Sequence, residues 1–308
     1  MVRRKSLRRK RNTHSRNHKS RKYRRRQHLG GDSSEKAVVC VLKAGGGFFS
    51  LYLTLLRACL YAKKQKLPFF IDDIDWQYKY KDGWHDYFKG LNVLNREEQF
   101  SSIERFENGA SNDIMDALTV EELIQTIQET FVLNDTLQAS VDSYIKGIGG
   151  DYTSLYVRRG DKIKEMELIS LDDILAQTTI QDDGRTIFVQ TDDYSVVKDM
   201  KSKFPSCNIM TLTKENASGA NNRELVKFTP EQRKEHTEEL LISTVVSARA
   251  NAGWSYHMSN VGMFIKLMGH NNIHLYTDKR YNKEEVDKAY ALTSTWKGIM
   301  DVHRAPKK

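Results

Sequence analysis

Residues 153–162 read Thr-Ser-Leu-Tyr-Val-Arg-Arg-Gly-Asp-Lys and carry the clearest architectural signal in the chain. A short apolar run ends directly in two arginines, a glycine, an aspartate and a lysine. Such a run predicts a strand over 153–157 that is buried in a parallel sheet. Because ligands bind at the carboxyl ends of the strands in such a sheet, we expect the charged residues after Val157 to face a ligand.

Strands and helices alternate on both sides of this stretch. The pattern before it predicts strands over 37–42 and 67–71, a helix over 48–65, and one helix from Thr119 toward residue 146. The pattern after it predicts strands over 186–190, 207–212, 250–253 and 272–276, and helices from 170, over 194–204, from 230 to about 249 and over 261–268. This alternation indicates an α/β fold with parallel sheets and helices on both faces.

A glycine-rich break at 147–150 divides the pattern into two halves. We therefore expect two Rossmann-like domains that face a cleft, over 35–150 and 151–308. Residues 1–34 are predicted to be a disordered basic tail with a short glycine and serine linker.

The positive charge of the chain is concentrated in this tail. Its 308 residues carry a net charge of +9, but residues 1–30 hold 14 Lys and Arg and no Asp or Glu, which leaves 35 basic and 40 acidic side chains in the remaining 278. Such a tail can bind nucleic acid or an anionic membrane, or serve as a nuclear address. We interpret it as a solvated appendage with nonspecific affinity for polyanions.

Other sequence features exclude several classes of protein. No segment approaches the about 18 uninterrupted apolar residues that a membrane helix needs, and the N-terminus lacks a signal-peptide core. Three widely spaced cysteines, Cys40, Cys59 and Cys207, exclude a disulfide scaffold and argue against a structural zinc site. We expect a protein of a reducing compartment, the cytoplasm.

The arginines after the predicted strand favour a phosphate site. Arg158 and Arg159 each carry a planar guanidinium that can hold a phosphate through two hydrogen bonds. Gly160 allows the chain to turn, and Asp161 can orient an arginine. A charged surface loop is the alternative interpretation, but the position after a buried strand favours the ligand site.

Three further strand ends are weaker candidates. Thr191 or Asp192 can cap the helix that follows the strand over 186–190. The turn around Ser255 and Tyr256 leads into a helix whose first N–H groups can bind an anion. Gly45, Gly46 and Gly47 either allow close backbone approach to a ligand or form a tight turn.

Asp73 and Asp75 have the spacing of the DxD element in metal-dependent sugar transferases, and carboxylates suit Mn²⁺ or Mg²⁺. Aspartate is common after a strand, so we interpret this pair as structural. The nearby aromatic residues can stack on sugars, but at these spacings we expect them to pack in a core: Trp76, Tyr78, Trp84 and Tyr87.

Taken in order, these motifs resemble the α1,6-fucosyltransferase family. The family contains the N-glycan core and bacterial nodulation fucosyltransferases, and the protein O-fucosyltransferases are more distant relatives. The resemblance rests on Val-Arg-Arg-Gly-Asp-Lys, Thr-Asp-Asp after a strand, the serine-containing turn before a helix, the glycine cluster, Trp76-Gln-Tyr and Gly83-Trp-His-Asp-Tyr-Phe. It covers roughly residues 38–268.

The resemblance implies a GT-B fold and an inverting, metal-independent transfer from GDP-fucose, with no further cofactor. Arg158 and Arg159 match the family's arginine pair, at least one of which holds the β-phosphate of GDP. A fixed guanidinium would stabilise the negative charge that develops there as GDP departs. The nucleotide-binding positions implied on the same basis are Gly46, Gly47, Asp161, Lys162, Asp192, Asp193 and Ser255.

Four positions depart from the family pattern. Tyr156 stands where the family has a histidine near guanine, and Tyr256 replaces the second serine of a pair near the pyrophosphate. The acidic guanine contact would fall at Leu240, so we expect the neighbouring Glu239, with Glu238 also close, to take its place. The acceptor-side glutamate would fall at Met166, which makes Glu165 or Glu167 the expected general base, since inversion needs a base within about 3 Å of the acceptor hydroxyl.

Two alternatives stay open at the level of sequence. One is a glycosyltransferase that uses another nucleotide sugar, with a metal held by Asp73 and Asp75. The other is an inactive core whose basic tail binds polyanions, with the steep salt dependence of charge contacts. For the enzyme we expect a glycan or other hydroxyl acceptor and a bacterial or viral source, the latter placing the protein in the cytoplasm of an infected host cell.

Overall fold

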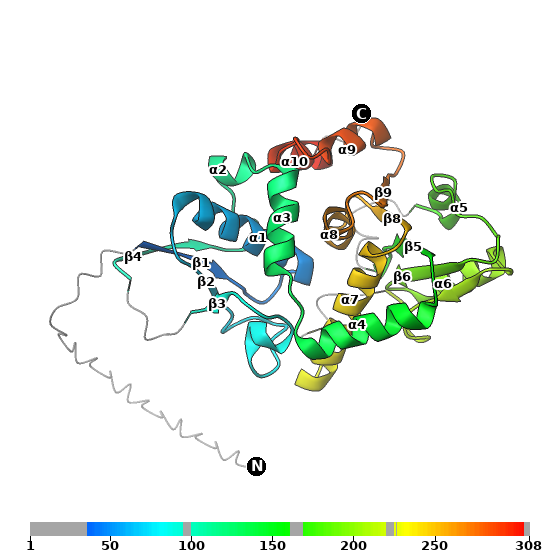
Figure 1. Ribbon diagram of the computed structural model, residues 1–308, viewed down its shortest axis with the longest axis horizontal. Helices are drawn as coiled ribbons and strands as arrows, with labels where there is room; N and C mark the ends of the chain where they lie inside the picture. The colour runs from blue at the N-terminus through cyan, green and yellow to red at the C-terminus, as the bar shows by residue number, and fades with distance from the viewer. Residues whose placement is uncertain (1–35, 95–99, 161–168, 220–224, 226, 305–308) are drawn as a thin grey trace, which may run out of the picture. The chain divides into compact units, whose positions relative to one another are not determined.

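The computed structural model describes residues 36–94, 100–160, 169–219, 225 and 227–304. The predictions for the tail and linker, and those for Asp161, Lys162, Glu165, Met166 and Glu167, lie outside these residues. Within them the chain forms two parallel sheets, and the predicted α/β fold with parallel sheets is confirmed (Figure 1).

The first sheet has the strand order β3-β2-β1-β4. In chain order its strands are β1 (Lys36–Val41), β2 (Phe69–Asp72), β3 (Asn92–Val93) and β4 (Ser102–Phe106). The buried run of β1 lies between β2 and β4, and its residue Val38 pairs with Phe69 on one side and Glu104 on the other. Burial on both faces explains why β1 reads as an almost continuous apolar run.

The second sheet has the strand order β7-β6-β5-β8-β9, again all parallel. Its strands are β5 (Tyr152–Val157), β6 (Thr186–Thr191), β7 (Asn208–Met210), β8 (Ala252–Tyr256) and β9 (Ile273–Tyr276). The stretch that resembled a buried strand is thus the central strand of this sheet. The chain moves outward from β5 to β7 and then returns to place β8 on the other side of β5, so the strand order reverses between β5 and β8.

Ten α-helices and one short 3₁₀ helix join these strands in the described part of the chain. They are α1 (Phe48–Gln65), η1 (Gly83–Asp86), α2 (Asp113–Asp116), α3 (Val120–Thr130), α4 (Asp135–Ile148), α5 (Leu171–Leu175), α6 (Tyr194–Lys203), α7 (Pro230–Ala248), α8 (Asn260–Met268), α9 (Lys283–Ala289) and α10 (Trp296–Arg304). The helix predicted from 230 to about 249 is confirmed: Thr229 and Gln232 form a capping box, and Pro230 takes the first helical position.

The single helix predicted from Thr119 toward residue 146 is wrong. Thr119 and Glu122 do form the expected capping box, but α3 ends at Thr130 and α4 begins anew after Asn134. The residues between them leave the helix because Leu133 pairs with Phe88 and the carbonyl of Val132 accepts from the amide of Lys89. The side chain of Asn134 then caps α4 by accepting from the amide of Leu137.

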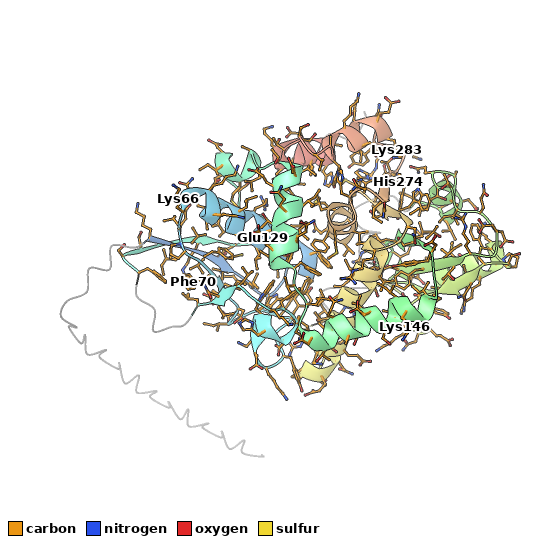
Figure 2. All side chains as sticks on the ribbon, in the orientation of Figure 1. Lys66, Phe70, Glu129, Lys146, His274 and Lys283 are labelled. Carbon is orange, nitrogen blue, oxygen red and sulfur yellow. The ribbon has the colours of Figure 1, made fainter. Side chains whose placement is uncertain are left out.

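One hydrophobic core joins elements of both sheets. The ring of Phe264 on α8 lies 4.6 Å from that of Phe49 on α1 and 4.7 Å from that of Phe131 after α3. Side chains fill the space between these helices (Figure 2), and residues 34–308 form one compact unit. The division into domains at residue 150 stays a prediction, although each sheet lies wholly on one side of it.

The C-terminal segment returns to the first half of the chain. The amide of Trp296 donates to the carbonyl of Leu118 at 2.7 Å, and the guanidinium of Arg57 on α1 lies 4.5 Å from the Trp296 ring. Arg57 is almost fully buried, and its positive charge is stabilised by this stacking and by a hydrogen bond to the hydroxyl of Ser111.

The described structure bears on two classes of protein that the sequence excluded, membrane-spanning proteins and disulfide scaffolds. Among the described residues no helix has the length and apolar character needed to cross a membrane. All three cysteines are free thiols, with Cys40 buried.

Candidate functional site

The arginine motif lies at the carboxyl end of β5 and is held by Asp192 at the end of β6. Val157 pairs with Thr191 in the parallel register, so the next residue on each strand meets the other. One carboxylate oxygen of Asp192 accepts from the guanidinium of Arg158 at 2.6 Å, and the other accepts from the amide of Arg159 at 2.7 Å. The side chains of Arg158 and Asp192 are only 15% and 11% exposed. This largely buried pair fixes both the arginine and the turn after β5.

The guanidinium groups of the two arginines bind different partners. Whereas Arg158 is paired with Asp192, Arg159 donates from its guanidinium to the carbonyl of Ile169 at 2.7 Å. Adjacent arginines therefore diverge. Arg158 is the one that lies across the strand end toward β6, and Arg159 ties the motif to the chain that leads into α5.

This edge is also where the strand order of the second sheet reverses. In α/β sheets the crevice at such a reversal is the general ligand site. Helix α8 begins on the far side of it, after β8, and Ser259 is its N-cap residue. The hydroxyls of Ser259 and Tyr156 lie 2.9 Å apart, which joins the start of α8 to the strand that carries the arginines. Free N–H groups at the start of a helix favour an anion.

Ser255 and Tyr256 brace this turn from inside the fold. Ser255 is fully buried and donates to the carbonyl of Gly262 at 3.0 Å. Tyr256 donates to Asp278 at 2.9 Å, and Asp278 is also paired with Arg280. The predicted contacts of Ser255 and Tyr256 with a nucleotide stay predictions. The serine hydroxyl at the N-terminus of α8 belongs to Ser259, which the sequence-based reasoning missed although it lies in the same motif.

His257 is a second residue that the sequence reasoning missed. Its ring is fully buried directly after β8, and Nδ1 lies 3.3 Å from the carbonyl of Tyr276. Nε2 has no hydrogen-bond partner among the described residues. Burial lowers the pKa of His257 to about 4, so the ring is neutral near pH 7.

Asp193 has a structural task at the start of α6. It is the N-cap residue and accepts from the amide of Ser195 at 2.9 Å. The expectation that Thr191 or Asp192 would cap this helix is therefore wrong, since Asp192 holds the arginines instead. The predicted contact of Asp193 with the nucleotide stays untested by this geometry.

Helix α7 carries two titratable groups with shifted pKa values, Glu239 and His236. Glu239 is half-buried, and burial raises the pKa of its carboxyl. One helical turn earlier, burial and the charges of Lys214 and Arg158 lower the pKa of His236. Glu238 instead forms an ion pair with Lys234 at 2.5 Å. His236 is therefore added to the candidate site. It was not singled out from the sequence, and the only local signal was its position one helical turn before Glu239.

The glycine cluster forms the turn between β1 and α1. Its backbone is clamped by Gln77, which accepts from the amide of Gly45 at 3.0 Å and donates to the carbonyl of Gly46 at 2.5 Å. A Cβ on Gly46 would meet Leu51 at 3.0 Å, and Gly45 has a φ of 97°. The Trp76-Gln-Tyr motif thus positions the glycine turn, while the predicted approach of Gly46 and Gly47 to a ligand stays a prediction.

Asp73 has the structural role expected from the sequence, whereas Asp75 is exposed. Asp73 is buried and accepts from the amide of Trp84 at 2.7 Å. Among the described residues no cluster of three or more His, Cys, Asp or Glu could hold a metal ion. The aromatic residues near the pair are all buried in the core, as expected: Trp76, Tyr78, Trp84 and Tyr87.

The α/β fold with these two parallel sheets matches that of solved fucosyltransferase structures. The chain is similar to the crystal structure of NodZ α-1,6-fucosyltransferase soaked with GDP-fucose, with a TM-score of 0.53 and 14% identity over 76% of this chain and 93% of that one. The same enzyme from Bradyrhizobium gives a TM-score of 0.54 at 14% identity with the same coverage. No protein-family model and no curated protein matches the sequence.

Two other fucosyltransferases share the fold. Arabidopsis thaliana FUT1 in complex with GDP has a TM-score of 0.51 and 11% identity over 84% of this chain and 73% of that one. POFUT1 in complex with GDP has a TM-score of 0.51 and 9% identity over 81% of this chain and 100% of that one. The resemblance inferred from the sequence motifs is therefore confirmed at the level of the fold.

Proposed function

We propose that the chain is a glycosyltransferase that moves fucose from GDP-fucose to a hydroxyl group of a glycan or another acceptor. The observation that carries this proposal is Arg158, held by Asp192 at the reversal of strand order, at the end of the strand that Tyr156 joins to the start of α8. The solved structures with this fold support the donor, since those of NodZ and POFUT1 are described with GDP-fucose and those of FUT1 and POFUT1 with GDP.

The chemistry fits a leaving nucleoside diphosphate. As the bond from the sugar to the β-phosphate breaks, negative charge grows on the phosphate oxygens. A guanidinium that is already fixed in place stabilises that charge without reorganisation in the transition state. Its planar fork suits two phosphate oxygens at once. Arg158 supplies this charge directly, so the proposal needs no metal ion.

The second part of the proposal concerns the acceptor. We propose that residues 35–150 form the acceptor side and residues 151–308 the donor side of a two-domain cleft. Transfer with inversion requires a base that takes the proton of the acceptor hydroxyl. Glu165 or Glu167 is proposed for this role on the strength of the family motif, since both follow the arginines in the chain.

Calorimetric titration of the full chain with GDP, GDP-fucose, UDP and GDP-mannose, in the presence of EDTA, tests the donor. We expect GDP and GDP-fucose to bind, and Arg158→Ala to weaken both by about 10- to 100-fold, because a hydrogen bond to a charged group contributes about 1.5–3 kcal/mol. Arg185→Ala is the matched control: Arg185 is exposed, is paired with Asp183, and precedes β6 at the amino edge of the same sheet.

The outcomes separate the alternatives. Preference for UDP, or binding that EDTA removes, would replace GDP-fucose with another nucleotide sugar or a metal-dependent site. A folded chain that binds none of the four nucleotides would refute the enzyme proposal and favour polyanion binding by residues 1–30. Equal losses in the Arg158 and Arg185 variants would show that net charge, rather than the strand-end site, governs binding.

A further inference from the structure

A groove runs along β7, the outer strand of the second sheet. It consists of two hollows of ≈ 700 and ≈ 420 Å³ that share Tyr144 of α4 and Met210 of β7. Both volumes lie in the range of small-molecule sites, about 300–1,000 Å³. None of the side chains proposed to bind the donor lines this surface, which we call the α4–β7 groove.

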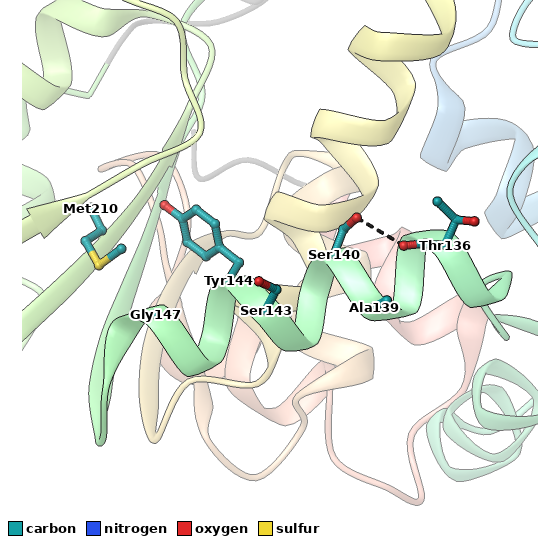
Figure 3. A pocket seen from close by; sticks show the side chains of 7 residues that line it. All are labelled: Thr136, Ala139, Ser140, Ser143, Tyr144, Gly147 and Met210. Carbon is teal, nitrogen blue, oxygen red and sulfur yellow. Dashed lines mark hydrogen bonds between the residues drawn. The ribbon is translucent and has the colours of Figure 1, made fainter.

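The larger hollow exists because α4 carries small side chains on its outer surface. Ala139, Ser140, Ser143 and Gly147 are exposed at successive turns of this helix (Figure 3). Exposed helix positions usually carry long charged side chains, which would fill such a space. Ser140 also donates to the carbonyl of Thr136 at 3.0 Å, so its hydroxyl keeps the capacity to accept a hydrogen bond.

Tyr144 forms the wall between the two hollows. Its ring lies edge-on against the buried Phe188 of β6, with the centroids 5.6 Å apart, and this contact fixes the plane of the ring. Burial raises the pKa of the hydroxyl to about 12, so it remains a hydrogen-bond donor at neutral pH. In the described part of the chain the hydroxyl has no partner, and in Figure 3 it points to the side on which Met210 lies.

The lining restricts the chemistry of a ligand. Seven residues line the larger hollow, and none of them carries a charge. A phosphate or carboxylate would therefore find no cation there to offset its charge. A purely apolar ligand would leave the hydroxyls of Thr136, Ser143 and Tyr144 without partners. A sugar satisfies both conditions, because its CH face packs on an aromatic ring while its hydroxyls donate and accept hydrogen bonds.

We propose that the α4–β7 groove binds a neutral oligosaccharide, with one sugar ring packed on Tyr144 and a neighbouring ring beside Thr211 and Thr213. The second hollow contains these two threonines beside Lys201, Lys214 and Glu215. These charged groups can donate to or accept from the hydroxyls of a neutral saccharide, so the saccharide can continue past the shared wall. The hydroxyl of Thr213 donates to the carbonyl of Thr191, the residue before Asp192, so this end of the groove approaches the donor edge. The proposal does not depend on transferase activity.

Saturation-transfer NMR on the full chain tests it, with maltotetraose, cellotetraose and N-acetyllactosamine as the probes. We expect at least one of these saccharides to receive saturation from the protein. Tyr144→Ala removes the wall, and Ser143→Arg fills the hollow from an exposed position. Both should weaken binding by about tenfold or more. Ser202→Arg is the matched control, because Ser202 is an exposed residue of α6 outside the groove.

The donor site is tested in the same samples. Saccharide binding should persist in Arg158→Ala and in the presence of excess GDP, whatever the donor specificity of the enzyme. Competition by GDP would place the saccharide in the donor site and overturn the proposal. The proposal is also overturned if none of the three saccharides binds, or if Ser143→Arg and Ser202→Arg bind the saccharide equally well.

Discussion

Asp192→Asn tests the arrangement at the centre of the donor site without changing its shape. The carboxylate accepts from Arg158 at 2.6 Å and from the amide of Arg159 at 2.7 Å. An amide has a single oxygen, so it can accept only one of these two bonds, and its NH₂ group must face the other donor. The substitution therefore removes the charge of the pair and sets two donors against each other.

The expected loss of stability follows from burial. Both partners are at least 85% buried, so the lost bond is one between ions that are largely shielded from water. A hydrogen bond to a charged group contributes about 1.5–3 kcal/mol, and breaking a buried pair costs about 3–5 kcal/mol. We expect the free energy of unfolding to fall by about 3 kcal/mol. If the guanidinium of Arg158 then occupies its binding position about one tenth of the time, GDP affinity falls about tenfold as well.

Urea unfolding of the full chain measures the first effect, and calorimetric titration with GDP measures the second. Asp183→Asn is the matched control, because it alters another Asp–Arg pair, that with Arg185, whose side chains are 33% and 57% exposed. Exposed pairs contribute about 0–1 kcal/mol, so this control should change stability little and GDP affinity not at all. Wild-type stability together with wild-type GDP affinity in Asp192→Asn would contradict the assigned role of the pair.

Two further predictions concern the buried turn after β8. Burial lowers the pKa values of His257 and His303 to about 4 and about 3, below the value of about 6.5 in an unfolded chain. The unfolded chain then binds more protons, so the free energy of unfolding should fall as the pH drops from about 6.5 toward 4, by about 3 kcal/mol for His257. Urea unfolding across this pH range should show a slope of stability against pH that His257→Gln reduces. An unchanged slope in this variant would contradict the assignment. Gly262→Ala should lower the melting temperature, because the new Cβ would lie 2.1 Å from the carbonyl oxygen of Tyr256. Gly147→Ala is the control: Gly147 lies inside α4 with open space around a Cβ, so this change should raise the stability by about 0.5–1 kcal/mol. Equal melting temperatures for the two variants would contradict this account of the packing.

Local patterns in the sequence were sufficient for most helices and strands. The apolar run of β5 and the helical spacing in α1 predicted elements that the structure contains, and the capping residues Thr119, Ser170 and Thr229 marked helix starts correctly. These signals are reliable because they depend on hydrogen bonds and side-chain spacing within a few residues.

Elements that depend on distant partners were missed. The short strands β3 and β4 carry little buried apolar surface, and they are strands because β2 and β1 offer them backbone partners. The break between α3 and α4 likewise depends on the pairing of Leu133 with Phe88. Helices α9 and α10 were also not predicted, although the capping residue Asn282 is a local signal for α9.

The features of the candidate site likewise fall into those that local sequence determined and those that depend on distant partners. The sequence by itself determined that two arginines follow a buried strand and that two aspartates follow another, because each motif is contiguous in the chain. Only the tertiary structure decided that Asp192 holds Arg158 while Asp193 caps a helix, and that Ser259 rather than Ser255 has its hydroxyl at the start of α8. The physical reason is register: the pairing of Val157 with Thr191 brings together groups 34 residues apart, and local sequence patterns do not specify that alignment.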